Sequence, residues 1–161
     1  MPRSRQSEDQ PYHLESSIGF LVYKAHQRAA AELRRALEPM GLTPPQFGVL
    51  ALLYRHDRQR QATLCERGAI DPNTMVGIVD RLEAASLVAR RRDPQDRRAY
   101  LVRITPKGRR TFENCIPLRN QAANRSWAML SPVEQNQLRD LLRKVLRLPE
   151  QRAREQDRAN G

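Results

Sequence analysis

The side chains with the clearest chemistry in this chain are the arginines and lysines gathered between Ser86 and Arg110. This stretch holds nine basic residues against two aspartates, so it carries most of the formal net charge of +11. Guanidinium and ammonium groups bind phosphate oxygens through charge-assisted hydrogen bonds. A local excess of positive charge of this size indicates a polyanionic partner such as nucleic acid.

Other kinds of site lack the residues that they would need. The cysteines and the three histidines show no metal-ligand spacing, and the sequence has no nucleophile–base set and no phosphate-binding glycine loop. No apolar run approaches the roughly 18 residues that span a bilayer, and the N-terminal residues lack the apolar segment of a secretory signal. We therefore expect a cytoplasmic protein that is not an enzyme, has no cofactor or metal and makes no membrane contact.

A long helix is predicted over residues 14–38, because apolar residues from Ile18 to Leu37 recur at helical spacing. Pro39 and Gly41 end it. A helix of about 25 residues is long for a small domain, which suggests a role beyond the local core.

A second helix and a helix-turn-helix pair come next. Thr43 and Gln46 have the spacing of a capping box and open the second helix, which is predicted to run to residue 54. Two further helices are joined by a tight turn that contains Gly68, an arrangement typical of DNA-binding helix pairs. These two helices are predicted over residues 61–67 and 72–85.

After Leu87 the hydrophobic pattern alternates, which predicts strands over residues 88–92 and 100–104 with a loop between them. Two more helices follow, capped by Thr105 and Ser131. The predicted fold is mainly α with a small β-hairpin wing, a winged helix-turn-helix with long N- and C-terminal helices. We expect one domain over residues 13–148 and flexible tails over 1–12 and 149–161.

The second helix of the pair fits the major groove of DNA, where its N-terminal outward residues reach the base edges first. Asn73 suits adenine, Thr74 suits a phosphate or a thymine methyl, and Arg81 lies on the same outward side. Gly77 either lets the backbone approach DNA closely or is a small residue on an exposed face. The inward side is predicted to hold Met75, Val76, Val79, Leu82 and Glu83.

The hairpin tip carries the adjacent arginines Arg97 and Arg98. Arginine side chains insert well into a narrow minor groove, where the potential is most negative. The remaining basic residues around the hairpin are assigned to phosphates, which adds affinity without reading sequence. They are Arg90, Arg91, Arg92, Lys107 and Arg109.

Residues 42–108 resemble the MarR family of transcriptional regulators. The matching motifs are Val79-Asp80-Arg81-Leu82-Glu83 in the recognition helix, Asp93-Pro94-Gln95-Asp96-Arg97-Arg98 at the wing tip and Ile104-Thr105-Pro106-Lys107-Gly108 after it. The chain departs from the family pattern at Ser86, where glycine is usual, and at Gly77, where a polar residue is common.

The resemblance implies a homodimer in which the first and last helices, about residues 13–39 and 109–148, interlock between subunits. Such a two-fold dimer would bind a pseudo-palindromic operator in double-stranded DNA, one half-site per subunit. The resemblance also implies a repressor that a small molecule releases from its operator.

The resemblance implies an effector pocket between the dimer helices and the DNA-binding lobe, and we expect it where the first helix meets the second. The side of the first helix opposite its apolar stripe carries Ser17, Phe20, Lys24 and Arg28, and Phe47 and Tyr54 of the second helix are expected to face it. Aromatic walls and a cation suit a small aromatic carboxylate. The stretch over residues 61–80 looks similar to family members that control aromatic-acid catabolism.

Two alternatives stay open. The regulator could respond to oxidation through Cys65 or Cys115, although relatives that do so carry a cysteine near the start of the first helix, where this chain has none. It could also be a constitutive architectural DNA-binding protein, which would bind without selecting one operator.

Replacing Arg97 and Arg98 together by alanine should weaken operator binding by more than about 1 kcal/mol, because both minor-groove cations are lost. A titration of labelled operator DNA at fixed salt measures the effect. The sedimentation of the variant should match that of the wild type. Equal affinity of the variant and the wild type for the operator would contradict the assignment of Arg97 and Arg98 to the minor groove.

Overall fold

Local cap residues fix where most of the long helices begin. Thr43, Asp71 and Ser131 each accept a hydrogen bond from the backbone amide three residues later. Thr105 does the same for Gly108 at 2.9 Å. Proline follows each of the four cap residues, and its fixed φ suits the first helical position.

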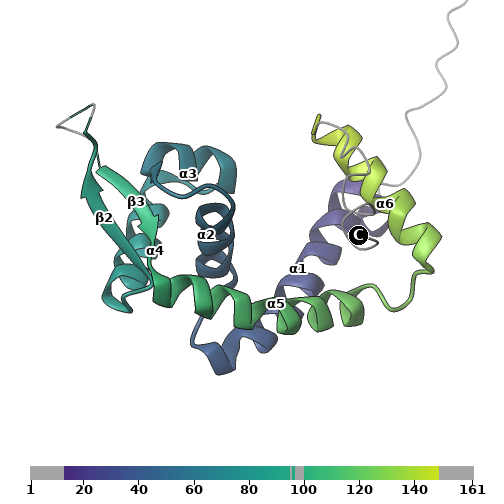
Figure 1. Ribbon diagram of the computed structural model, residues 1–161. Helices are drawn as coiled ribbons and strands as arrows, with labels where there is room; N and C mark the ends of the chain where they lie inside the picture. The colour runs from purple at the N-terminus through teal and green to yellow at the C-terminus, as the bar shows by residue number, and fades with distance from the viewer. Residues whose placement is uncertain (1–12, 95, 97–99, 149–161) are drawn as a thin grey trace, which may run out of the picture. The chain divides into compact units, whose positions relative to one another are not determined.

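The structure, a computed structural model, describes residues 13–94, 96 and 100–148 (Figure 1). These residues form two compact units, up to Ala123 and from Asn124 onward. The two predicted tails lie outside the described residues, and the single domain over 13–148 stays a prediction. In chain order the elements are η1 (Leu14–Ser16), α1 (Ile18–Leu37), η2 (Glu38–Met40), α2 (Pro44–Arg55), β1 (Gln59–Arg60), α3 (Gln61–Gly68), α4 (Pro72–Ala84), β2 (Val88–Arg92), β3 (Tyr100–Ile104), α5 (Pro106–Ser126) and α6 (Pro132–Val145).

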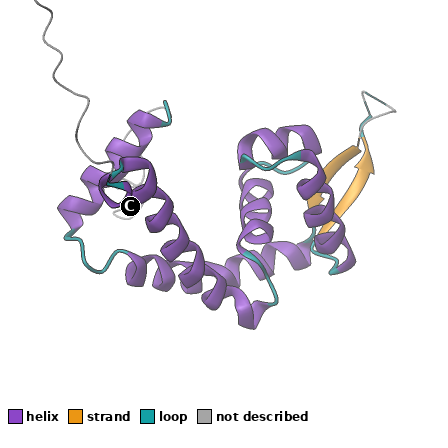
Figure 2. Cartoon of the chain, turned by 180° about the vertical axis from the view of Figure 1, so that it is seen from behind, coloured by secondary structure: helices purple, strands orange, loops and turns teal. Residues whose placement is uncertain are grey.

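The mainly helical fold with a small wing is confirmed (Figure 2). Several helix ends differ from the predicted ones by one residue. The larger difference is at the first helix, which was predicted from residue 14, but α1 begins at Ile18 because Ser17 has an extended backbone, with φ −67° and ψ 127°. Leu14–Ser16 form a separate 3-10 turn. At the other end Gly41 adopts φ 65°, a left-handed conformation that suits glycine.

The sheet has three antiparallel strands in the order β1-β3-β2. β2 and β3 have the predicted bounds and pair with Val88 opposite Ile104 and Arg92 opposite Tyr100. The sequence analysis missed β1, which pairs Gln59 with Val102. A two-residue strand is too short to show any hydrophobic period. β1 pairs with β3 and continues directly into α3, so it links the wing to that helix.

The core of the first unit lies between the helix-turn-helix pair, α2 and the sheet. Its largest fully buried side chains include Leu50, Leu53, Leu64, Leu82 and Ile104. The prediction that Val76 lies on the inward side of α4 is wrong, because 43% of its surface is exposed. Ile78 is buried instead, and together with Met75, Val79 and Leu82 it follows the spacing of one helix face.

Large apolar side chains remain exposed on α1 and, within the second unit, on α6. Those on α1 are Ile18, Leu21 and Val22, and those on α6 are Val133, Leu141 and Val145. Exposed apolar residues in such number on single helices mark surfaces for a further partner. Among the described residues, no helix is both long enough and apolar enough to cross a membrane.

Gly108 should tolerate no side chain, because a Cβ atom there would lie 2.0 Å from the Leu87 carbonyl oxygen and 2.9 Å from Ile104 Cγ1. We expect Gly108→Ala to lower the free energy of unfolding by about 2–3 kcal/mol in a urea titration. Gly77→Ala is the matched control. A Cβ at Gly77 meets nothing within 4 Å, so this variant should gain about 0.5–1 kcal/mol. Equal stability of the two variants would contradict the packing at Gly108.

Candidate nucleic-acid interface

The turn between α3 and α4 positions the start of the recognition helix. The sequence predicted that Gly68 stops α3, but Gly68 is its last helical residue and Ala69 adopts the left-handed conformation, with φ 50°. This conformation costs an alanine roughly 1 kcal/mol or more. Asp71 then caps α4, accepting a hydrogen bond from the Thr74 amide at 2.9 Å.

Asn73 and Thr74 lie exposed in the first turn of α4. Hydrogen bonding by Thr74, through its side chain and then its backbone amide, lowers the pKa of the Asp71 carboxyl. The Thr74 hydroxyl is therefore held beside Asp71. The geometry makes Asn73 the better placed of the two to contact a base.

Gly77 and Arg81 lie farther along the same helix. Gly77 is half-buried, and nothing lies within 4 Å of where its Cβ would be. The protein's own packing therefore does not require glycine at this position. Arg81 is exposed.

Arg90 joins the recognition helix to the wing. Its guanidinium contacts Asp80 Oδ1 at 2.5 Å and Glu83 Oε2 at 2.6 Å, and its backbone amide donates to Glu83 Oε1 at 2.9 Å. Only 23% of the Arg90 side chain is exposed. We predicted that Arg90 binds a phosphate, but two carboxylates of α4 already neutralise it. The structure gives it the role of fixing β2 against α4.

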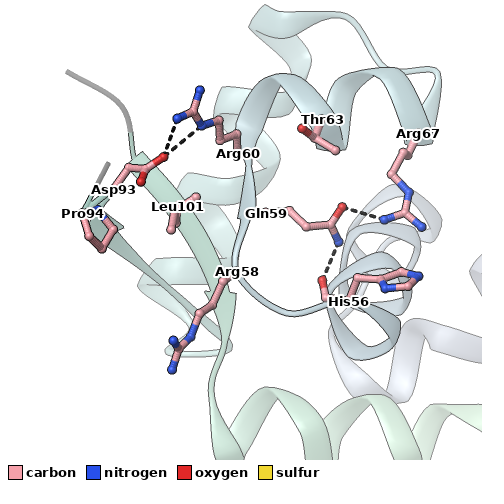
Figure 3. A pocket seen from close by; sticks show the side chains of 9 residues that line it. All are labelled: His56, Arg58, Gln59, Arg60, Thr63, Arg67, Asp93, Pro94 and Leu101. Atoms are coloured by element: carbon pink, nitrogen blue, oxygen red, sulfur yellow. Dashed lines mark hydrogen bonds and ion pairs between the residues drawn. The ribbon is translucent and has the colours of Figure 1, made fainter. Parts of the chain in front are cut away.

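A second ion pair anchors the base of the wing loop (Figure 3). Arg60 of β1 donates through Nε and Nη2 to Asp93 Oδ2, at 2.9 and 2.7 Å, and Asp93 is 6% exposed. Beside it, the buried Gln59 side chain donates to the His56 carbonyl and accepts from Arg67. The first aspartate of the wing-tip motif therefore holds the loop and does not face solvent.

The segment after α4 is tied to the start of α5. Ser86, where the family usually has glycine, adopts φ 60°, the left-handed conformation that favours glycine. Thr105 Oγ1 donates to the Ser86 carbonyl at 2.8 Å. Lys107 Nζ donates to the Ala85 carbonyl at 2.9 Å and so caps the end of α4. Lys107, predicted to bind a phosphate, therefore also has a structural contact.

Arg97 and Arg98 lie outside the described residues, so their minor-groove role stays a prediction. Arg91 and Arg92 are exposed on β2. Arg109 was assigned to phosphates, but its guanidinium lies 5.4 Å from the centre of the Tyr54 ring. That contact is a cation–π interaction.

Phe47 and Tyr54, two of the predicted effector residues, meet on α5. Their rings lie 5.1 and 4.8 Å from the ring of Phe112. Tyr54 Oη also donates to Glu113 Oε1 at 2.9 Å, and this hydrogen bond raises the pKa of Tyr54. The sequence analysis missed Phe112 and Glu113, and it assigned Arg109 to phosphates without its contact to Tyr54. Their spacing of three and four residues, which places them on one side of a helix, was the available signal.

Of the other four predicted effector residues, three lie on α1 and one directly precedes it. Ser17 precedes the helix as its cap residue, Phe20 is half-buried, and Lys24 and Arg28 are exposed. α1 packs against α2. Contact of these four residues with an effector stays a prediction.

The geometry does not favour the redox alternative. Cys115 is buried within α5, and burial raises the pKa of its thiol, which disfavours the reactive thiolate. Cys65 is half-buried and packs against the core.

Comparison with known proteins gives consistent matches. The family model described as "MarR family" matches residues 42–100. The transcriptional repressor NicR of Pseudomonas putida is 34% identical over 145 residues, which cover 90% of this chain and 92% of the relative.

Two solved structures are similar in both sequence and fold. Bordetella bronchiseptica BpsR, whose DNA binding is regulated by 6-hydroxynicotinic acid, is 34% identical with a TM-score of 0.80, covering 84% of this chain and 97% of BpsR. CouR of Rhodococcus jostii, bound to p-coumaroyl-CoA, is 31% identical with a TM-score of 0.73, covering 84% of this chain and 95% of CouR.

The Arg90 contacts predict a pH-dependent stability. The backbone hydrogen bond from Arg90, followed by its side-chain hydrogen bond and charge, lowers the pKa of Glu83 below its usual value of 4.5. A lowered pKa means that the charged carboxylate stabilises the fold above about pH 4.5, and that this contribution disappears as Glu83 is protonated at lower pH.

Glu83→Gln should therefore lower the free energy of unfolding by about 0.5–1 kcal/mol at pH 7. The difference from wild type should shrink below about pH 4.5 in urea titrations. Glu66→Gln, an exposed change on α3, is the control and should have almost no effect. A difference at pH 7 that persisted unchanged at pH 3 would contradict the ion pair as its cause.

Proposed function

The chain belongs to the MarR family of transcriptional regulators, and on that basis we propose that it is a repressor which a small aromatic acid releases from its operator. The observation that carries this proposal is the pairing of an exposed recognition helix with a basic wing, held together by Arg90. We place its action in the cytoplasm, where the DNA is.

We propose that the two parts of the interface have separate duties. Asn73, with Thr74 beside it, reads base edges in the major groove. Arg97 and Arg98 enter the minor groove. The exposed cations Arg91 and Arg92, with others around the wing, bind phosphates and make the affinity depend on salt. Arg90 acts indirectly, because it holds the wing at a fixed position relative to α4.

The active form is proposed to be a two-fold dimer. Ile18 and Leu21 of α1 are 81% and 53% exposed, and Val145 of α6 is 77% exposed. Side chains of this kind are rarely left in water over several helical turns. Burial of these faces in a second subunit would also place two recognition helices for one pseudo-palindromic operator.

The effector is proposed to be a small aromatic carboxylate that binds where α1 packs against α2. Phe47 and Tyr54, backed by Phe112, supply aromatic surface, and Lys24 or Arg28 supplies a cation for the carboxylate. The chemistry of the BpsR effector, a hydroxylated pyridine carboxylic acid, supports this class.

The test is a fluorescence anisotropy titration of the DNA upstream of the protein's own gene, with and without 6-hydroxynicotinate, 4-hydroxybenzoate or p-coumarate. At least one acid should weaken binding about tenfold or more, equal to roughly 1.4 kcal/mol. The double change Lys24→Gln and Arg28→Gln should remove that response and leave binding without effector unchanged. Arg139→Gln, an exposed change in α6, is the matched control.

The corresponding primary amides, which lack the carboxylate, should have little effect. DNA binding that none of the acids alters at millimolar concentration would contradict an aromatic carboxylate effector. Binding that is equally tight to unrelated DNA would contradict the repressor itself and favour an architectural protein.

A further inference from the structure

Two arginines, Arg58 and Arg103, lie side by side where the chain enters β1. Asp57 Oδ1, just before Arg58, accepts a hydrogen bond from the Ile104 amide at 2.9 Å. The residue just after Arg58 pairs with Val102. Arg58 and Arg103 lie between these two contacts, one on each segment, so the backbone holds them as neighbours.

Both arginines lie on the outer face of the sheet, the face that is turned away from the core. Val102 and Ile104, on either side of Arg103, are 1% and 2% exposed, and side chains alternate between the two faces of a strand. In Figure 3 the Arg58 side chain points away from the buried Gln59. Arg58 is exposed and Arg103 is half-buried.

The acidic residues nearby compensate other arginines and leave this pair without a partner. Two carboxylates of α4 hold Arg90 on the inner face, and Asp93 holds Arg60. Asp93 is also the one acidic residue that lines the hollow of about 660 Å³ beside Arg58 (Figure 3). In the part of the chain that the structure describes, neither Arg58 nor Arg103 has an ion-pair partner. Like charges on neighbouring strands repel, so an anion from outside the chain would stabilise the pair.

The backbone at Arg58 also has a cost in stability. Its φ of 58° is in the left-handed region, which is unfavourable for a residue with a Cβ atom. Glycine would adopt this conformation without strain. A cation in a strained backbone conformation, with no partner within the chain, is typical of a binding site.

We propose that Arg58 and Arg103 bind phosphates of the DNA that flanks the operator. Arg90 shows that α4 lies on the inner side of the sheet, so DNA that touches the outer face lies beyond the wing and outside the half-site that α4 contacts. Arg91 follows Arg90 on β2 and is exposed on the outer face, which extends the positive surface. Guanidinium groups suit phosphate oxygens, and such contacts do not read sequence. The proposal rests on the proposed binding of an operator, but not on the effector.

The test compares two duplexes with the same operator. One ends at the outer ends of the half-sites, and the other continues for about 15 base pairs, or one and a half helical turns, on each side. In anisotropy titrations the wild-type dimer should bind the longer duplex at least about fivefold more tightly. The double change Arg58→Gln and Arg103→Gln should bind both duplexes equally and should bind the short duplex as the wild type does.

Salt dependence gives a second readout of the same contacts. On the longer duplex, the slope of log affinity against log salt should become less steep by about 2 in the double variant, since one phosphate contact in each subunit contributes roughly 0.9. On the short duplex the slopes of the two proteins should agree. A double variant that keeps the wild-type preference for the longer duplex overturns the proposal.

The matched control is the double change Arg34→Gln and Arg139→Gln. It removes the same charge from exposed positions on α1 and α6, and it should keep the preference for the longer duplex. Equal losses in the control and in the Arg58 and Arg103 variant would overturn the proposal, because net charge alone would then explain both. Arg58→Gly covers the case in which the double variant is unstable. This change relieves the left-handed backbone, so it should raise the thermal midpoint and still reduce the preference.

Hydroxyl-radical footprinting on the longer duplex separates this inference from the proposed function. The wild type should protect sugars outside the half-sites, and the Arg58 and Arg103 variant should lose that protection alone. Protection of the half-sites only would overturn the inference, favour an acidic protein as the partner of the outer face, and leave the proposed repressor intact. Protection without any defined operator would contradict the repressor itself.

Discussion

The DNA-facing side of this protein depends on one polar junction, the contact of Arg90 with Asp80 and Glu83. The sheet packs on the core through the buried side chains of Val88, Val102 and Ile104. The cations that bind DNA must stay in water, so beside this apolar contact the wing is joined to α4 by polar groups. The two carboxylates lie one helical turn apart and hold a single guanidinium and the adjacent backbone amide. Arg60 and Asp93 repeat this solution at the other side of the wing. Ion pairs are directional, so they fix the angle between helix and hairpin more narrowly than a small apolar contact could.

The parts of the fold that could be predicted from sequence are those with a strong local signal. The bounds of β2 and β3 follow from an alternating pattern, and the helix starts follow from cap residues with proline. The predictions were wrong at single residues, where the sequence had to show which side chain is buried or which residue ends a helix. Val76 was placed inward and Ile78 was overlooked because both are apolar, and Val76, three positions before Val79, also fits a helical spacing with the buried residues. The left-handed turn falls on Ala69 rather than Gly68, since the position of the last hydrogen bond of α3, and not residue preference, determines it.

In the candidate site, too, some residues could be predicted from the sequence and their contacts could not. Asn73, Phe47 and Tyr54 were singled out from residue type and spacing, and the structure places each of them on the expected helix. Their partners could not be found that way. Glu113 lies 59 residues from Tyr54, and no local pattern reports a contact over that separation. The contacts that Arg90 and Arg109 make within the chain could not be predicted for a related reason. An arginine within a run of basic residues looks the same in the sequence whether its side chain contacts a phosphate, a carboxylate or an aromatic ring. Only the folded structure shows which of these partners it has.

The four prolines that follow the cap residues affect how the sequence of this protein can evolve. A proline raises the stability of the folded protein mainly because it restricts the conformations of the unfolded chain. The gain in free energy of unfolding is about 0.4–1 kcal/mol where the native φ suits proline. The starting residue of α4 is therefore encoded within Asp71, Pro72 and Thr74, and owes little to the apolar side chains packed beneath it. Core residues can therefore change without shifting the register of the residues that meet DNA. Operator specificity and core composition are in this sense free to evolve separately.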